Sequence, residues 1–140
     1  MPEQTDAFVP RLVKKAESGV RVRILIGDPD GDAVALRGKE EDVGDGMAQR
    51  ARLCLRYFRE AADVKGLEVR LHDTTLYASI YRADNVALVN THVYGSTAAQ
   101  NPVLHLQRVP GGRVFDNYME SFDTIWTSAK SANPFIKSAA

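Results

Sequence analysis

The sequence predicts an α/β fold in which a mixed parallel and antiparallel sheet of about five strands is flanked by helices. The first half of the chain alternates between helical and strand periodicity, which favours parallel pairing of its two strands through a crossover. The second half opens with two strand patterns separated by Asp84-Asn85, which predicts an antiparallel hairpin. At 140 residues, the chain is long enough to bury one hydrophobic core.

The chain opens with a predicted helix and strand. Apolar residues recur at helical spacing from Phe8 to Ala16, Pro10 fits the first turn, and Gly19 ends the pattern. Apolar residues then alternate from Val20 to Ile26, which is typical of a strand.

A turn and a loop follow this strand. In GDPDGD, glycine and proline force a turn, while Asp28, Asp30 and Asp32 can cap the segment AVALRG through their side-chain oxygens. The polar stretch KEEDVGDG after it predicts a loop.

The longest helix is expected to begin at Asp45 and to end at Gly66. Its apolar residues fall on one side, which must pack on a sheet. Alternation from Leu67 to Leu71 then predicts the second strand.

Strand patterns at 76–82 and 86–90 form the predicted hairpin, and 103–109 forms a fifth strand. A helix is expected from Arg113 to Ala132, with Asn133-Pro134 as its stop and 133–140 as a flexible tail. Residues 1–132 are therefore expected to form a single domain. The chain begins almost directly with a helix, which fits a piece excised from a longer protein as well as a complete small protein.

Composition excludes several classes of function. The 18 basic residues balance 18 acidic ones, so no nucleic-acid or anionic-membrane surface is expected. The single cysteine, Cys54, indicates no disulfide framework and favours a reducing compartment. There is no apolar run long enough to cross a bilayer and no signal-peptide pattern, so we expect a cytoplasmic protein without membrane contact.

Three segments carry a family resemblance: GVRVRILIGDPDGDAV, GLEVRLHDTTLYASIYRADNVALVNTHVYG and ESFDTIWTSA. Together they resemble an uncharacterised phospholipase D-like domain found C-terminal to a helix-turn-helix in bacterial transcriptional regulators. The resemblance implies a phospholipase D-like half: a mixed sheet flanked by helices. Two such halves make one active site, so one half per chain implies a homodimer.

The sequence departs from the catalytic pattern of that superfamily. The enzymes carry a histidine, a lysine two residues later, an aspartate five residues after that, and a Gly-Ser pair beyond. If Asp84 holds the aspartate position, Tyr77 and Ser79 stand where histidine and lysine would be, and Thr91-His92 replaces the Gly-Ser pair. Covalent catalysis and charge stabilisation are both lost, so no catalytic residue is assigned.

Polar residues near strand ends form the predicted ligand site, because ligands of open α/β sheets bind where strands end. The expected ligand-binding residues are Asp28, His72, Asp73, Tyr77, Ser79, Asp84, Asn90, Thr91, His92 and Tyr94. Simpler roles remain open for several of them. Asp73 can cap a turn, His92 can bond a loop carbonyl, and Tyr77 can pack on a half-buried sheet face.

No metal or cofactor is expected. The DPDGD motif lacks the distant glutamate of a calcium loop, and the histidines lack zinc-binding spacing. The same turn has aspartates where a phosphate-binding loop would need free backbone N–H groups and a lysine.

These observations favour a non-catalytic ligand-sensing or regulatory domain of a bacterial transcriptional regulator. Its expected partners are a second copy of itself, an unknown small molecule, and DNA only through a helix-turn-helix outside this chain. A phosphodiesterase or hydrolase with an atypical histidine site is the first alternative, with His92 or His72 oriented by Asp73 or Asp84. A simple dimerisation module is the second.

Overall fold

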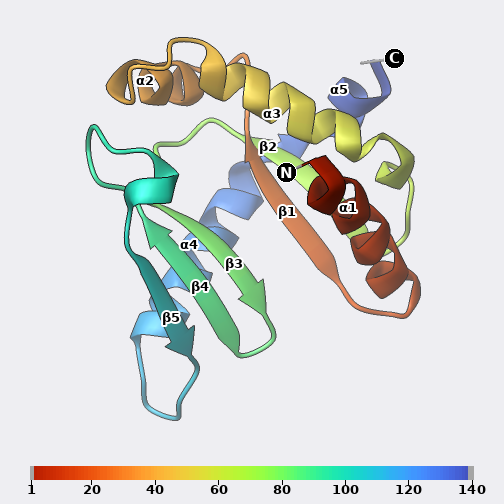
Figure 1. Ribbon diagram of the computed structural model, residues 1–140. Helices are drawn as coiled ribbons and strands as arrows, with labels where there is room; N and C mark the ends of the chain where they lie inside the picture. Colours follow the sequence, from red (N-terminus) through yellow and green to blue (C-terminus); the bar gives the residue numbers. More distant parts are fainter. Residues whose placement is uncertain (1, 139–140) are drawn as a thin grey trace.

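The computed structural model describes residues 2–138, including the side chains of 7–97 and 99–137. It confirms the α/β class with mixed pairing but contains two three-stranded sheets instead of one sheet of five strands (Figure 1). The expected single sheet was wrong because the second and third strands do not pair with each other. A two-residue strand near the C-terminus takes the free edge of the second strand.

Sheet A has the order β1-β2-β6. The parallel pairing predicted for the first two strands is confirmed: β1 (Val22–Gly27) runs beside β2 (Leu67–His72) in continuous register. The strand β6 (Lys130–Ser131) pairs antiparallel with β2.

Sheet B is antiparallel, in the order β3 (Ala78–Ala83), β4 (Val86–Thr91) and β5 (Val103–Gln107). The predicted hairpin is confirmed, because Ala83 lies opposite Val86 across the two turn residues. Asp84 has φ 53°, a left-handed conformation that aspartate tolerates better than most residues.

Three helices cover sheet A. The helices α1 (Pro2–Glu17) and α3 (Gly46–Tyr57) lie over it, together with α5 (Asn133–Ser138) (Figure 1). The α1 helix contains Pro10 in its interior and not in its first turn. The α3 helix is shorter than expected, since a 3₁₀ turn, η1 (Arg59–Ala61), follows it.

The C-terminal segment is more ordered than the sequence suggested. The helix α4 (Val114–Ser128) ends before β6, and the expected flexible tail is helical as far as Ser138. The reason is apolar burial: Ile136 is 1% exposed within the sheet A core, and Phe135 packs against the same core.

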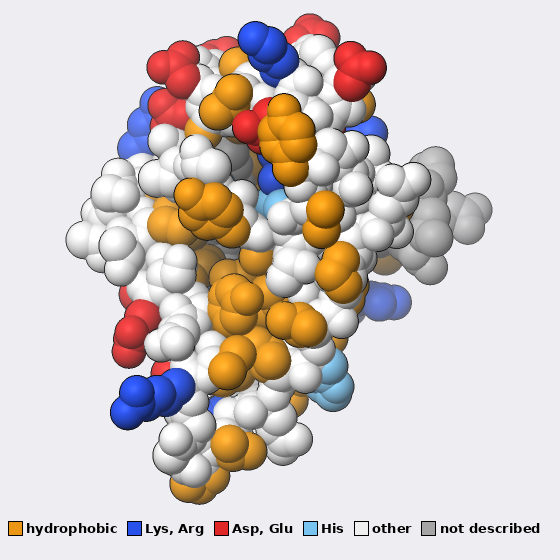
Figure 2. Space-filling model, turned by 90° about the vertical axis from the view of Figure 1, so that its left-hand side faces the viewer, with side chains coloured by type: hydrophobic (Ala, Val, Ile, Leu, Met, Phe, Trp, Pro, Cys, Tyr) orange, Lys and Arg blue, Asp and Glu red, His pale blue; other side chains and the backbone are white. Residues whose placement is uncertain are grey.

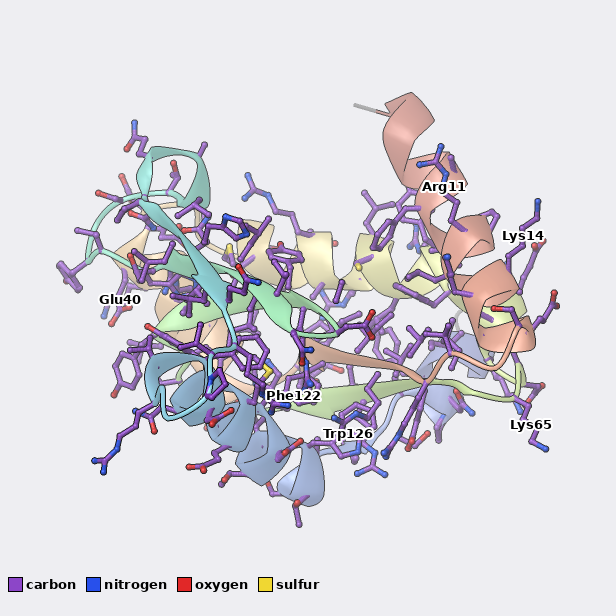
Figure 3. The ribbon with its side chains drawn as sticks, turned by 90° about the horizontal axis from the view of Figure 1, so that it is seen from below. Arg11, Lys14, Glu40, Lys65, Phe122 and Trp126 are labelled. Atoms are coloured by element: carbon purple, nitrogen blue, oxygen red, sulfur yellow. The ribbon has the colours of Figure 1, made fainter. Side chains whose placement is uncertain are left out.

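The helix α4 connects the two sheets. Its N-terminal half packs Phe115 and Met119 against Ala87 of sheet B. Its C-terminal half places Phe122 and Trp126 beside sheet A, with ring centroids 5.8 Å apart (Figure 3). The guanidinium of Arg70 in β2 lies 4.3 Å from the Trp126 ring centroid, a cation–π contact that fixes this end of the helix.

None of the helices formed by residues 2–138 combines the length and apolar character needed to cross a bilayer.

Candidate functional site

The helix α2 (Asp32–Glu40) approaches the polar ends of both sheets. Its first turn is bonded to Asp73, which follows β2, and its last turn is bonded to His92, which follows β4. In Figure 1 the segment after β4 lies beneath α2. Polar side chains, including several of the predicted site residues, gather in two places. We call them the sheet A end (Asp28, His72, Asp73 and Lys130) and the His92 cluster (Glu41, Arg37, His92 and Ser79).

At the sheet A end, Asp73 caps α2. Its Oδ1 accepts a hydrogen bond from the backbone N–H of Ala33, 2.9 Å away. The residue at the N-cap position is Gly31, which has no side chain to do this, and a Cβ built there would lie 2.5 Å from Asp73 Oδ1. The cap expected from the aspartates of the preceding turn thus comes from Asp73, the residue after β2. The helix end that would otherwise attract an anion already holds a carboxylate.

Asp28 is also held by neighbouring groups. Its Oδ1 accepts a hydrogen bond from Asp30 N–H at 2.9 Å, and its Oδ2 lies 3.0 Å from Lys130 Nζ. Burial acts to raise the pKa of Asp28, but the Asp30 N–H and the Lys130 ammonium outweigh it and hold this pKa below the ordinary 3.8. The same contact raises the pKa of Lys130.

His72 is buried, with Nδ1 3.1 Å from Thr74 Oγ1. Burial lowers its pKa below the ordinary 6.5, against the attraction of Asp73, so the imidazole is neutral near pH 7. The groups of the sheet A end therefore have partners within the protein, although Asp73 and Lys130 are exposed to solvent.

The His92 cluster joins α2 to sheet B. Arg37 donates from Nε to Glu41 Oε2 at 2.9 Å, and its Nη1 lies 2.6 Å from His92 Nδ1. On the other side of the ring, His92 Nε2 lies 3.2 Å from Ser79 Oγ. The Glu41 side chain is 7% exposed and that of Arg37 is 20% exposed, so the carboxylate lies deep and the guanidinium lies nearer the surface.

His92 Nδ1 faces two partners with opposite requirements. The carbonyl oxygen of Leu76 lies 3.0 Å away and can only accept, whereas Arg37 Nη1 can only donate. One nitrogen serves a single one of them at a time: Nδ1–H donates to Leu76, or the Nδ1 lone pair accepts from Arg37. The expected bond from His92 to a loop carbonyl is therefore one of two available arrangements.

Two exposed tyrosines flank the cluster. The carbonyl of Tyr77 accepts a hydrogen bond from His92 N–H at 2.8 Å, and Tyr94 follows two residues later. Their exposed fractions are 81% and 83%, so Tyr77 is not a half-buried packing residue. On the face shown in Figure 2, a blue and a pale-blue side chain lie recessed between hydrophobic ones, above a larger hydrophobic patch.

The other predicted residues lie along sheet B. Asn90 stands opposite Ser79 in the register, and Thr91 stands opposite Ala78. Asp84 occupies the turn between β3 and β4, at the other end of the hairpin from His92. Since Asp73 caps α2, neither carboxylate considered as an orienting group for His92 contacts it among the described residues.

Sequence reasoning missed Arg37 and Glu41. Both lie within the stretch AVALRGKEEDVGDG. Its second half, KEEDVGDG, was predicted to be a loop, whereas α2 continues to Glu40. The detectable signal was an Arg–Glu pair four residues apart, a spacing that meets on a helix. Its partner His92 lies 55 residues away, a distance that no local pattern reveals.

A separate hollow of about 500 Å³ lies between α2 and α3, lined among others by Pro29, Val34, Ala48 and Arg52. No residue of the His92 cluster lines it. Among the described residues, no group of three His, Cys, Asp or Glu side chains is placed to hold a metal ion.

A family model described as "Domain of unknown function (DUF5919)" matches residues 7–133. No curated protein and no solved structure matches the chain.

Proposed function

Because the chain belongs to the DUF5919 family, whose function is unknown, its role is argued from its own residues, and we propose that it is a non-catalytic ligand-sensing domain. A small molecule would bind at the His92 cluster. In a regulator of the kind that the sequence resembles, binding would bias the geometry of a homodimer or the docking of an attached helix-turn-helix domain.

One observation carries this proposal: the chain of contacts from Glu41 through Arg37 and His92 to Ser79, with exposed tyrosines beside it. A small set of convergent polar groups is one of the features of a ligand site. If Asp84 holds the aspartate position of the phospholipase D-like pattern that the sequence resembles, Tyr77 and Ser79 stand where the catalytic histidine and lysine would be, which supports binding without catalysis.

The position of α2 supports a sensing role. Its first turn is fixed to sheet A through Asp73, and its last turn is fixed to sheet B through His92. A ligand that changes the contacts of Arg37 therefore acts on a helix that is bonded to residues at the ends of both sheets. Such a ligand shifts a conformational equilibrium only by its difference in affinity for the two states.

The test is a thermal-shift screen of the chain against a metabolite library, since a ligand stabilises the folded state that binds it. Hits should lose their shift in His92→Ala and keep it in His105→Ala, which removes an exposed histidine of β5. A library without hits, or hits unaffected by His92→Ala, would contradict the proposal.

A hydrolase is the second candidate, and the 3.2 Å contact of Ser79 Oγ with His92 Nε2 favours it. With Nδ1–H bonded to Leu76, Nε2 would accept the Ser79 proton as the oxygen attacks an ester carbonyl, and would pass that proton to the alcohol that leaves as the ester C–O bond breaks. Water would then hydrolyse the acyl-serine to the free acid and Ser79. Chromogenic esters and phosphodiesters test this function. Turnover that disappears in both Ser79→Ala and His92→Ala would favour the enzyme over the sensor.

A dimerisation module without a ligand is the third candidate function, and it predicts a dimer by light scattering with no response to any compound.

A further inference from the structure

The His92 cluster contains a guanidinium that is fixed on one side and open on another. Glu41 holds Arg37 at Nε, and His92 lies at Nη1, while within the described part of the chain Nη2 has no hydrogen-bond partner. A guanidinium held in this way presents donors in a plane, the geometry that matches a carboxylate. These donors can bond to an acceptor from outside the chain, since the Arg37 side chain is 20% exposed.

The two requirements at His92 Nδ1 also point to an acceptor. While Arg37 Nη1 uses the Nδ1 lone pair, the Leu76 carbonyl cannot receive a proton from that nitrogen. A ligand oxygen that takes over Arg37 Nη1 frees Nδ1 to donate to Leu76, and Nε2 then accepts from Ser79 Oγ. A ligand group that donates a hydrogen bond could not take over Arg37 Nη1, so Arg37 and Leu76 would still compete for His92 Nδ1.

Glu41 limits the charge of the ligand. Its side chain is 7% exposed and lies 2.9 Å from Arg37 Nε, so it already balances part of the guanidinium charge. A monoanion fits this environment better than a phosphate dianion, which would be repelled by the buried carboxylate.

The tyrosines indicate what the anionic group is attached to. Tyr77 and Tyr94 are largely exposed to water; the backbone carbonyl of Tyr77 accepts from His92 N–H, and Tyr94 lies two residues after His92. Aromatic rings stack on other planar rings with an additional stabilisation beyond the area that they bury.

Resting on the proposed function, we infer that the ligand class is a small aromatic carboxylic acid. Its carboxylate binds Arg37 through Nη1 and Nη2, and its ring lies against Tyr77 and Tyr94. No bond is made or broken.

The experiment is a titration of the ¹⁵N-labelled chain, followed by NMR, with three probes. Benzoate carries both features, benzamide keeps the shape without the charge, and acetate keeps the charge without the ring. Benzoate should shift the amides of residues 37, 77, 92 and 94 and bind at least about tenfold more tightly than either other probe, a difference of about 1.4 kcal/mol.

Arg37→Met should weaken benzoate binding at least about tenfold, which is the expected consequence of losing a charge-assisted bidentate contact. The matched control is Arg108→Met, since Arg108 also pairs with a carboxylate, Asp116 at 3.2 Å, in the sheet B region. Tyr94→Ser alters an exposed side chain and keeps the test valid if Arg37→Met does not fold.

The outcomes separate the inference from the proposed function. Benzamide or acetate binding as tightly as benzoate at these residues, or benzoate binding unchanged in Arg37→Met and Tyr94→Ser, overturns the ligand class and leaves a ligand site in place. If neither these probes nor any library compound shifts residues 37, 77, 92 and 94, both the ligand class and the sensing function are overturned.

Discussion

The sheet A end and the His92 cluster both combine a histidine with charged side chains, but they differ in how those side chains are paired. At the sheet A end, Asp73 caps α2, Asp28 pairs with Lys130, and His72 is buried. In the His92 cluster, Arg37 keeps an open edge, and the neighbouring tyrosines are largely exposed. Similar residue types therefore stabilise the fold in one place and remain available for a ligand in the other.

The hydrophobic cores beneath the two regions also differ, in the number of buried residues that they contain. Among the described residues, the sheet A cluster contains ten buried hydrophobic residues, and the cluster between α4 and sheet B contains three. The outer face of sheet B exposes Tyr81 and Leu88, which lie opposite each other, at 65% and 45%. We expect sheet A to carry most of the stability and sheet B to tolerate change, as functional regions commonly do.

The largest effect tests this difference in the cores. Ile136→Ala should lower the free energy of unfolding by about 2–5 kcal/mol, because it leaves a cavity in the sheet A core. Leu88→Ala, on the exposed face of sheet B, should cost less than about 1 kcal/mol. Urea unfolding measures both. Equal losses would show that the sheet A core contributes no more to stability than the exposed face of sheet B.

The next effect tests the role of Asp73. Asp73→Ala should cost about 1 kcal/mol, within a range of about 0.5–2, because α2 loses its cap, while Asp73→Asn should cost less because an amide oxygen still accepts. Neither change should alter ligand binding at the His92 cluster. An Asp73→Ala variant with unchanged stability and no ligand binding would mean that the sheet A end is itself the ligand site.

Local patterns predicted much of the fold, and the failures were non-local. Periodicity and the Asp84-Asn85 turn predicted the parallel pair and the hairpin. The split into two sheets depends on β6, whose two residues are too few to show a pattern.

The predictions for the site likewise succeeded where local patterns were informative and failed where contacts are non-local. His92, Ser79 and Tyr77 were predicted from the ends and faces of strands, and the structure brings them together. Arg37 and Glu41 were not, because their contact with His92 exists only in the folded chain. For the same reason, the capping role of Asp73, 40 residues from Ala33, was one of two open interpretations.

A smaller effect concerns the pH dependence of the sheet A end. Since burial lowers the pKa of His72 in the folded state, the unfolded chain binds more protons below pH 6.5, and stability should fall as pH falls through that value. Above pH 6.5, His72 does not make the free energy of unfolding depend on pH. His72→Gln should flatten the decrease in urea midpoint between pH 7 and the folded pKa, while His105→Gln on β5 serves as the matched control. An unchanged profile in His72→Gln would show that His72 does not titrate as a buried group.

The smallest effect on stability is expected at the exposed edge of the His92 cluster. Tyr77→Ser should change the free energy of unfolding by no more than about 0.5 kcal/mol, because the side chain is 81% exposed and few contacts are lost. The same variant should weaken benzoate binding, because it removes one of the two rings proposed to lie against the ligand. Together these results would separate the stabilising region from the binding region. A loss of stability above about 1 kcal/mol would instead place Tyr77 among the packing residues of sheet B, since surface changes away from packed features rarely cost that much.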